Sequence, residues 1–429
     1  MVDKVIPNGW RVCKLGELGQ IVTGKTPPTK YKEYYGGETP FITPTDMDGR
    51  KVIASTQRYL TEGGVQSVRS SLIPKGTVFV SCIGSDMGKV GIAGARGITN
   101  QQINSIIVEP PNDPEYVYYQ LSTRKDELQR LATSGSAQPI LNKGHFSELD
   151  IILPSPAEQR AIAHILGTLD DKIELNRRMN QTLEAMAQAL FKSWFVDFEP
   201  FRDQGMEESP SGPIPKGWTH TSLGSFTKLD KGVSYKGRFL SDDGLPMINL
   251  GCFLGHGEFS LQNLKYYAGD YRDRHLVYPG DIVIANTDIT QKREVLGSPA
   301  MVPPSETHNS YLFTHHVYAL RFDNIHQHWK RYVFFTLLEA AFRERAVGFA
   351  TGTTVLALPR DAILDYQVVN PGNRLIDAFA DQLEPMLALQ YVNDKQSHTL
   401  ATLRDALLPK LLSGETRIRD AGKLLREAV

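Results

Sequence analysis

Apolar residues recur at alternating steps of three and four along two stretches of about 40 residues, which is the spacing of a coiled-coil seam. The first stretch follows Ser155-Pro156-Ala157-Glu158, a capping box that predicts the start of a helix. Its seam positions are Ile162, Leu166, Leu169, Ile173, Asn176, Asn180, Leu183, Ala187, Leu190 and Trp194. Those of the second stretch are Phe379, Leu383, Met386, Gln390, Asn393, Ser397, Leu400, Arg404, Leu407 and Leu411.

Each of these helices needs a partner, because about 40 helical residues extend for about 60 Å and exceed what one small domain can cover. Both seams become polar near the middle, at Asn176 and Asn180 in the first and at Gln390, Asn393 and Ser397 in the second. If the helices pair antiparallel, these polar centres meet, and buried Asn residues then fix register and orientation. The alternative is that the polar positions face solvent on bent helices.

An internal repeat runs through the rest of the chain. Gly9-Trp10 with Leu15-Gly16 recurs as Gly217-Trp218 with Leu223-Gly224, at an offset of 208 residues. The strand-like run Val78-Phe79-Val80 matches Ile282-Val283-Ile284, each after a Gly-containing turn, at an offset of 204. Three further features recur at an offset of 217, namely Ser134-Gly135 as Thr351-Gly352, Pro154 as Pro371, and Asn176 as Asn393. The pattern indicates two duplicated domains that have diverged in length, whereas their helices have kept one register.

These patterns predict an α+β chain of two globular α/β domains, each followed by a long helix. We expect the two helices to pair as an antiparallel coiled coil, with a pseudo-twofold relation between the copies. The expected parts are a first domain over 1–154, a first long helix over 155–198, a linker over 199–213, a second domain over 214–370, and a second long helix with a C-terminal tail over 371–429. The linker, EPFRDQGMEESPSGP, has the composition of a connecting segment.

Composition is that of a folded protein, with 41% hydrophobic and 22% charged residues. The net charge of −1 gives no overall attraction to nucleic acid, so any such binding must come from local patches. Cys13, Cys82 and Cys252 are widely separated, which favours reduced core thiols over a disulfide or a zinc site. No apolar run is long enough to span a membrane and the start lacks a secretory signal, so we expect a cytoplasmic protein.

The sequence contains no recognisable catalytic motif. The segment from Gly84 to Val90 resembles a phosphate loop, but it has three residues between its glycines instead of four, and Val90 stands where Ser or Thr must hold magnesium. No adenine methyltransferase, nuclease or helicase motif is found. His315-His316 and His326-Gln327-His328 admit a metal site as an alternative, although we interpret them as ordinary strand or loop residues. The sequence predicts no catalytic residue, no metal and no cofactor.

Several motifs in combination resemble the specificity subunits of type I restriction-modification systems. They are Ile6-Pro7-Asn8-Gly9-Trp10, Gly24-Lys25-Thr26-Pro27, Thr99-Asn100-Gln101-Gln102, Pro156-Ala157-Glu158-Gln159-Arg160, Phe191-Lys192-Ser193-Trp194-Phe195 and the run from Leu408 to Glu415. The second half departs from this pattern. Asn-Gln-Gln has no clear counterpart near Phe313-Thr314-His315-His316, and the Gly-Lys-Thr-Pro turn becomes Lys231-Gly232-Val233-Ser234.

The resemblance implies that 1–154 and 214–370 are target-recognition domains for double-stranded DNA. It also implies that two methyltransferase subunits dock on the helical regions and that translocating endonuclease subunits join them. Catalysis and cofactors would belong to those partners. Because the two domains differ, we expect an asymmetric target with two unlike half-sites. The rival hypotheses are the recognition half of a single-chain enzyme, which would need a catalytic domain in the same chain, and a coiled-coil scaffold whose two domains bind other proteins.

DNA-binding residues are sorted by chemistry, because cations hold phosphates whereas polar side chains read base edges. The expected phosphate contacts are Lys25, Lys30, Lys32, Lys89, Lys231, Lys236, Arg238, Lys292 and Arg293. The expected base-reading residues are Tyr31, Tyr34, Ser85, Asp86, Asn100, Gln101, Gln102, Ser136, Gln138, Tyr235, Asn286, Asp288, Gln291 and Thr353. The alternative is that loop amides only satisfy the backbone.

Aromatic residues at the end of the first long helix suggest an anchor for a partner subunit. We expect Trp194, Phe195 and Leu411 at that interface. Packing within the chain itself is the alternative.

Overall fold

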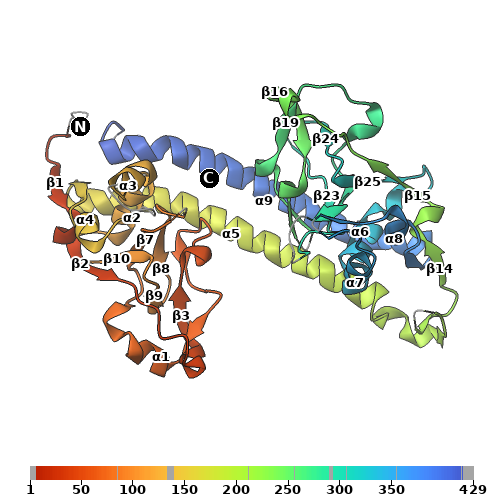
Figure 1. Ribbon diagram of the computed structural model, residues 1–429, viewed down its shortest axis with the longest axis horizontal. Helices are drawn as coiled ribbons and strands as arrows, with labels where there is room; N and C mark the ends of the chain where they lie inside the picture. The colour runs from red at the N-terminus through yellow and green to blue at the C-terminus, as the bar shows by residue number, and fades with distance from the viewer. Residues whose placement is uncertain are drawn as a thin grey trace. The chain divides into compact units, whose positions relative to one another are not determined.

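The computed structural model describes residues 6–84, 86–132, 140–210, 212–255, 257–288, 293–305, 307–353, 355–416 and 418. The chain divides into two compact units, one made of 1–178 with 393–429 and the other of 179–392. We call these unit 1 and unit 2. Two long helices, α5 (Pro156–Phe195) and α9 (Asn373–Ser413), each contribute to both units (Figure 1). Unit 1 is therefore completed by the end of the chain.

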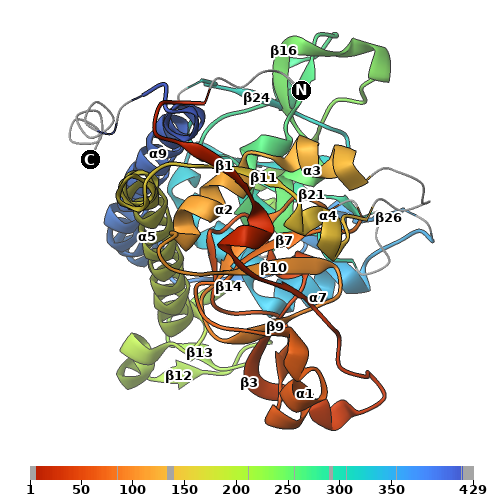
Figure 2. The same ribbon diagram turned by 90° about the vertical axis from the view of Figure 1, so that its left-hand side faces the viewer.

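Unit 1 contains two main sheets. The strands of its first sheet are, in spatial order, β2 (Gly19–Thr23), β10 (Ile103–Val108), β7 (Val78–Ser81), β8 (Val90–Ala93) and β4 (Val52–Ile53). Those of its second sheet are β5 (Tyr59–Leu60), β3 (Tyr35–Ile42), β9 (Gly97–Thr99) and β6 (Leu72–Ile73). In addition, β1 (Arg11–Lys14) pairs with β11 (Asp150–Leu153), which brings the two ends of the globular part together (Figure 2).

Unit 2 repeats this arrangement. Its first sheet has the order β15 (Thr227–Lys231), β25 (Val317–Phe322), β21 (Ile282–Ala285) and β23 (Pro299–Met301). Its second sheet has the order β19 (Lys265–Tyr267), β16 (Leu240–Ile248), β24 (Tyr311–Phe313) and β20 (Leu276–Val277), and β14 (Thr219–Ser222) pairs with β27 (Gln367–Asn370). The one parallel neighbour pair in each second sheet also matches, β3 with β9 and β16 with β24. The repeat in the sequence is thus a repeat of topology.

Shorter elements complete the units. The helices of unit 1 are α1 (Glu62–Ser67), α2 (Pro114–Ser122), α3 (Lys125–Ala132) and α4 (Lys143–Ser147), and those of unit 2 are α6 (Lys330–Leu338), α7 (Ala340–Gly348) and α8 (Arg360–Leu364). The minor strands are β12 (Met206–Glu207), β13 (Ile214–Pro215), β17 (Phe253–Gly255), β18 (Glu258–Phe259), β22 (Thr287–Asp288) and β26 (Leu356–Ala357). The segment expected to be a linker holds η5 (Glu199–Gln204) and β12, and β12 pairs with β13.

The long helices begin and pair much as their sequences predict. Ser155 Oγ accepts a hydrogen bond from the Glu158 amide at 3.3 Å, so Ser155 caps the start of α5. The helices run antiparallel in each unit, because the residue numbers of the contacting positions rise along α5 as they fall along α9. In unit 1, Asp170 contacts Arg404 and Asn176 contacts Asn393. In unit 2, the Asn180 and Gln390 side-chain amides each donate to the other residue's carbonyl oxygen, at 3.4 and 3.1 Å.

The predicted seam is buried or half-buried along both helices, and Asn176 and Asn393 are among its buried positions. The alternative in which the polar centre faces solvent is wrong for these two residues. Each unit has its own core around the seam, including Leu166 and Leu407 in unit 1 and Phe191 and Phe379 in unit 2. No helix in the described ranges is both long and apolar enough to cross a membrane.

Candidate nucleic-acid interface

The loop that begins at Gly24, directly after β2, carries the first predicted cation, and we call it the first turn. The Gly24 amide donates to the Ile103 carbonyl at 3.0 Å, and the Lys25 amide donates to the Thr99 carbonyl at 2.9 Å. A Cβ atom at Gly24 would lie 2.0 Å from the Asn100 carbonyl oxygen, so only glycine permits this close approach. Gly24 therefore places the exposed Lys25 side chain directly beside the next turn.

That next turn is Asn100-Gln101-Gln102, between β9 and β10. Asn100 is buried, and its side chain stiffens the turn by donating to Gln102 Oε1 at 2.9 Å and accepting from the Gln102 amide at 3.1 Å. Thr26 Oγ1 donates to Gln101 Oε1 at 2.5 Å, which joins the two turns. The structure thus brings Lys25 and the exposed Gln101 together, whereas Asn100 supports them from below.

A second cluster of predicted residues surrounds η2 (Lys32–Tyr34). The Tyr31 and Tyr34 rings lie 5.1 Å apart, and Lys30 Nζ lies 4.8 Å from the centre of the Tyr31 ring. Lys30, Tyr31 and Lys32 are exposed. A hollow of about 640 Å³ next to them is lined by Thr29, Lys32, Tyr35, Gly36, Gly37, Gln57, Arg58 and Tyr59. Sequence reasoning missed Arg58, although Gln-Arg-Tyr in a polar loop was an available signal.

Some predicted residues are engaged elsewhere or cannot be placed. Lys89 Nζ forms an ion pair with Asp86 at 2.9 Å and donates to the Pro44 carbonyl at 3.3 Å, so its charge is partly neutralised. The following predicted residues lie outside those that the structure describes: Ser85, Ser136, Gln138, Gln291 and Lys292.

Unit 2 builds the same pair of turns with different side chains. The Gly232 amide donates to the Val317 carbonyl at 3.3 Å, as that of Gly24 does to Ile103, and the Val233 amide donates to the Phe313 carbonyl at 2.8 Å, as that of Lys25 does to Thr99. A Cβ atom at Gly232 would lie 2.1 Å from the Phe313 carbonyl oxygen. Gly232 is therefore the counterpart of Gly24.

The Asn-Gln-Gln turn does have a counterpart, which corrects the sequence-based expectation. The Thr314 amide donates to the carbonyl of Ile248 on β16, as that of Asn100 does to Ile42 on β3, both at 2.9 Å. The His316 carbonyl accepts from the Asn286 amide at 3.0 Å, and the Gln102 carbonyl accepts from the Cys82 amide at 2.7 Å.

Thr314, His315 and His316 thus replace Asn100, Gln101 and Gln102. The correspondence was hidden because the residue types differ and because this segment lies at an offset of 214, between the offsets of the flanking matches.

The other predicted residues of unit 2 divide by exposure. The side chains of Lys231, Lys236, Arg238, Arg293 and Thr353 are exposed. Tyr235 is half-buried, and its hydroxyl accepts from Lys265 Nζ at 2.7 Å. Lys265 is a further cation that sequence reasoning missed.

Asn286 and Asp288 are buried and serve the fold. Asn286 Nδ2 donates to the His315 carbonyl at 3.1 Å, and Asp288 Oδ2 accepts from the Val295 amide at 2.9 Å. Both side chains hold the loops from inside. They are positioned to support the surface and not to reach a base edge.

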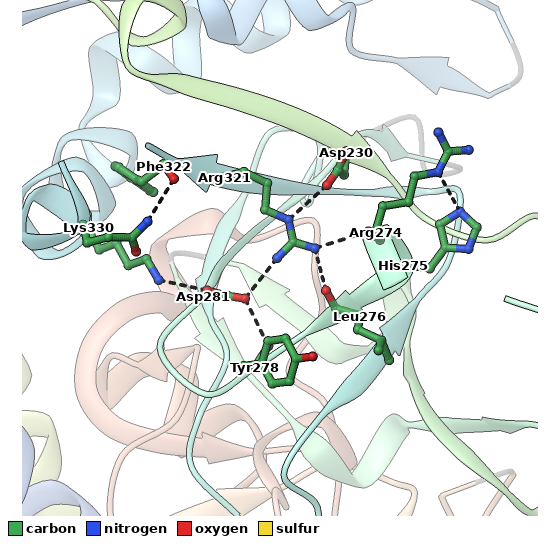
Figure 3. A network of polar contacts seen from close by, with 10 residues as sticks. Asp230, Arg274, His275, Leu276, Tyr278, Asp281, Arg321, Phe322 and Lys330 are labelled. Carbon is green, nitrogen blue, oxygen red and sulfur yellow. Dashed lines mark hydrogen bonds and ion pairs between the residues drawn. The ribbon is translucent and has the colours of Figure 1, made fainter. Parts of the chain in front are cut away.

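Nearby basic residues are neutralised within unit 2 (Figure 3). Arg321 on β25 forms ion pairs with Asp230 and Asp281, each at 3.1 Å, and donates to the Leu276 carbonyl at 2.5 Å. Lys330 Nζ lies 2.9 Å from the other oxygen of Asp281. This network fastens α6 to the first sheet of unit 2 and leaves the exposed lysines and arginines of the loops as the available positive charge.

The adjacent histidines lie with their ring centres 3.8 Å apart. Burial, followed by the charge of Lys231, lowers the pKa of His315. Burial, the neighbouring His315, and then Lys231 and Lys265 lower the pKa of His316. Both shifts favour the neutral form of the rings. Within the described ranges, no group of three or more His, Cys, Asp or Glu residues is arranged to hold a metal ion.

Two of the three expected partner-interface residues lie in the core of their own unit. Phe195 is buried in a cluster of aromatic rings that includes Trp218, Tyr332 and Phe379. Leu411 is buried in the core of unit 1. Neither side chain presents a surface to another subunit, so intramolecular packing accounts for both. Trp194 is half-buried against Phe379 and keeps a partly exposed face.

Comparison with known proteins agrees with this architecture. A family model described as the type I restriction modification DNA specificity domain matches residues 7–185. The MjaIX specificity subunit of Methanocaldococcus jannaschii is 30% identical over 97% of this chain and 95% of its own length. The HindI specificity subunit of Haemophilus influenzae is 34% identical over 43% of this chain and 41% of its own length.

A solved structure with a similar fold is the S subunit of a type I restriction-modification system from M. genitalium. It has a TM-score of 0.57 and 16% sequence identity, over 96% of this chain and 97% of that chain. The chain belongs to the family of type I restriction enzyme specificity subunits.

Proposed function

We propose that this chain is the DNA-recognition subunit of a type I restriction-modification complex and directs methyltransferase and endonuclease subunits to an asymmetric bipartite target. The observation that carries the proposal is the pair of turns built twice on one main-chain frame. The frame holds Lys25 and Gln101 in unit 1 and Val233 and His315 in unit 2. Equal scaffolds with unlike side chains suit the recognition of two unlike half-sites.

The two recognition domains would be 1–154 and 214–370. The helices over 155–198 and 371–429, with the connection over 199–213, would hold these domains in one assembly. The chain would itself be non-catalytic and without a cofactor. Two methyltransferase subunits and endonuclease subunits would supply the chemistry in the cytoplasm, with Trp194 the remaining candidate from the expected interface set.

Exposed cations would hold phosphates, and neighbouring polar side chains would read base edges. The cations best placed for the first task are Lys25, Lys30, Lys32, Lys231, Lys236, Arg238 and Arg293. The polar candidates with an accessible side chain are Tyr31, Tyr34, Asp86, Gln101, Gln102, Tyr235 and Thr353. Asn100, Asn286 and Asp288 would act by supporting these loops.

The decisive experiment selects duplexes from a random pool with the full chain and its methyltransferase partner. We expect one target with two different half-sites separated by a spacer of fixed length. Failure to enrich any duplex sequence, or enrichment of a perfect palindrome, would contradict the proposal. A scaffold that binds only proteins would enrich nothing, which separates that alternative.

A salt titration tests the assignment of cations. Each phosphate contact contributes about 0.9 to the slope of log affinity against log salt, so the variant Lys25→Ala/Lys30→Ala/Lys32→Ala should lower the slope by about 3. Lys75→Ala is the matched control, because Lys75 is an exposed lysine of the same unit that lies outside these turns. Equal slopes for the triple variant and the parent would show that these lysines do not contact phosphates.

A further inference from the structure

We infer that His315 and His316 determine sequence preference in the second half-site, at the place where Gln101 and Gln102 act in the first. The inference rests on the proposed function and assigns a specificity determinant within it. It makes one short turn a source of the difference between the half-sites.

The two turns share one main-chain frame. Each turn also closes on itself in the same way, because the Ile103 amide donates to the Asn100 carbonyl at 3.1 Å and the Val317 amide donates to the Thr314 carbonyl at 2.9 Å. The residues that donate to the two turns, Cys82 and Asn286, also accept matching hydrogen bonds. The Leu141 amide donates to the Cys82 carbonyl, and the Leu358 amide donates to the Asn286 carbonyl. Side chains at matched positions therefore leave the two turns from equivalent points.

The side chains on this shared frame differ in the hydrogen bonds that they can make. A glutamine amide offers a donor and an acceptor side by side, the pattern that matches adenine in the major groove. A neutral histidine has one donor nitrogen and one acceptor nitrogen on opposite sides of the ring, and a protonated histidine has two donors. Nδ1 of His315 is buried, and Nδ1 of His316 is taken by Thr287, so each ring can present only Nε2 to a base. Paired histidines therefore cannot reproduce the amide pattern, and two adjacent Nε2–H donors suit the acceptors N7 and O6 of guanine.

The surroundings of the histidines are basic on the faces that the structure describes. His316 Nδ1 lies 2.9 Å from Thr287 Oγ1 of β22, and the His315 ring lies 6.4 Å from that of Tyr235. Lys231 at the end of β15 and Lys265 on β19 are the charged groups that bear on the pair. DNA phosphates or guanine acceptors would offset this positive charge and favour protonation of the rings. Binding to the second half-site should therefore strengthen as pH falls, whereas the glutamines of unit 1 do not titrate.

An exchange of side chains between the turns is the main test. Targets are selected from a random duplex pool with the parent, with His315→Gln/His316→Gln and with Gln101→His/Gln102→His, each as the full chain with its methyltransferase partner. We expect each variant to change the preferred base at one or two adjacent positions of one half-site only. His164→Gln, at an exposed position of α5, is the control and should select the parental target.

The pH dependence provides an independent readout on the parent protein. Two duplexes are used, each with one selected half-site intact and the other scrambled, at constant ionic strength. Affinity for the duplex with the second half-site should rise about 3- to 10-fold between pH 8 and pH 6, and affinity for the first should stay within about twofold. This comparison uses only the parent, so it holds even if His315→Gln/His316→Gln or Gln101→His/Gln102→His lowers the melting temperature.

The outcomes separate the inference from the proposed function. Unchanged base preference in folded variants, or equal pH profiles for the two half-sites, would overturn the inference and leave the proposed function intact. Selection of no duplex by the parent would overturn both.

Discussion

Asp170 on α5 and Arg404 on α9 form an ion pair with 2.7 Å between Oδ1 and Nη1, and Asp170 Oδ2 also accepts a hydrogen bond from the Tyr119 hydroxyl at 2.5 Å. One carboxylate thus joins the helix pair to α2 of unit 1. Burial lowers the pKa of Arg404, but the hydrogen bond and charge of Asp170 outweigh it, so the pKa lies above its usual value.

Asp170→Asn should destabilise unit 1, because it removes the largely buried carboxylate partner of Arg404 and leaves only the exposed Asp405 to pair with the guanidinium. We expect a loss of about 2–4 kcal/mol in the free energy of unfolding, measured by urea denaturation. Arg178→Ala is the control, since Arg178 forms an exposed ion pair with Glu174 on the same helix and should change stability by less than about 1 kcal/mol. Equal losses in the free energy of unfolding for the two variants would contradict a stabilising role of the Asp170–Arg404 ion pair.

Asn176→Ala should weaken the pairing of the helices at their polar centre. Asn176 Nδ2 lies within 3.3 Å of three acceptors on α9, the Asn393 carbonyl, Gln396 Oε1 and Ser397 Oγ. Removing the donor leaves these buried and half-buried acceptors less satisfied, at a cost of about 1–3 kcal/mol in urea denaturation. Gln181→Ala on the exposed face of α5 should stay close to the parent, and a similar loss there would point to a general helix effect.

Phe195→Ala should lower the stability of unit 2 by about 3–5 kcal/mol, because it opens a cavity among packed aromatic rings. The neighbouring Val196 is 39% exposed, so Val196→Ala serves as the matched control. Thermal unfolding of the free chain gives the measurement. A Phe195→Ala chain that keeps the parental melting temperature but no longer assembles with the methyltransferase would restore the interface interpretation.

Cys82 should resist alkylation in the native chain. Burial raises the pKa of its thiol to about 11, so the reactive thiolate is scarce at pH 8 and the sulfur is also covered. Iodoacetamide at pH 8 should leave Cys82 unmodified until urea unfolds the protein, as mass spectrometry of peptides would show. Labelling of Cys82 in native protein at the rate of the unfolded chain would refute this.

The same shift has a consequence for stability against pH. The folded pKa of Cys82 lies above the ordinary value of 9.0, so its stabilising contribution is complete below about pH 9 and is lost as pH rises toward about 11. Cys82→Ala should therefore flatten this alkaline limb of the stability curve.

Periodicity predicts the long helices well because their burial follows a local rule. The seam from Ile162 to Trp194, the Ser155 cap and the antiparallel meeting of the polar centres all follow from residue spacing. Residue spacing does not predict where individual polar side chains lie. Asn286 and Gln101 are both amide residues that the sequence predicts to read bases. In the structure Asn286 is buried and donates to the His315 carbonyl, because strand pairing brings residues from distant segments together. The His315-His316 turn was missed for the same reason, since its identity lies in main-chain hydrogen bonds and not in residue type.

Unit 1 is made of two segments that are separated in the sequence by the whole of unit 2, so a newly made chain can complete the folding of unit 2 before that of unit 1. A ribosome releases the N-terminal part first, yet Leu400, Leu407 and Leu411 belong to the core of unit 1. The core cluster that holds Leu166 and Leu169 of α5 therefore stays incomplete until Asn393 and the residues after it have emerged. Unit 2 is continuous in sequence and can finish earlier. A nascent chain that stops before Asn393 would expose an apolar helix face, the kind of surface that chaperones bind and proteases clear.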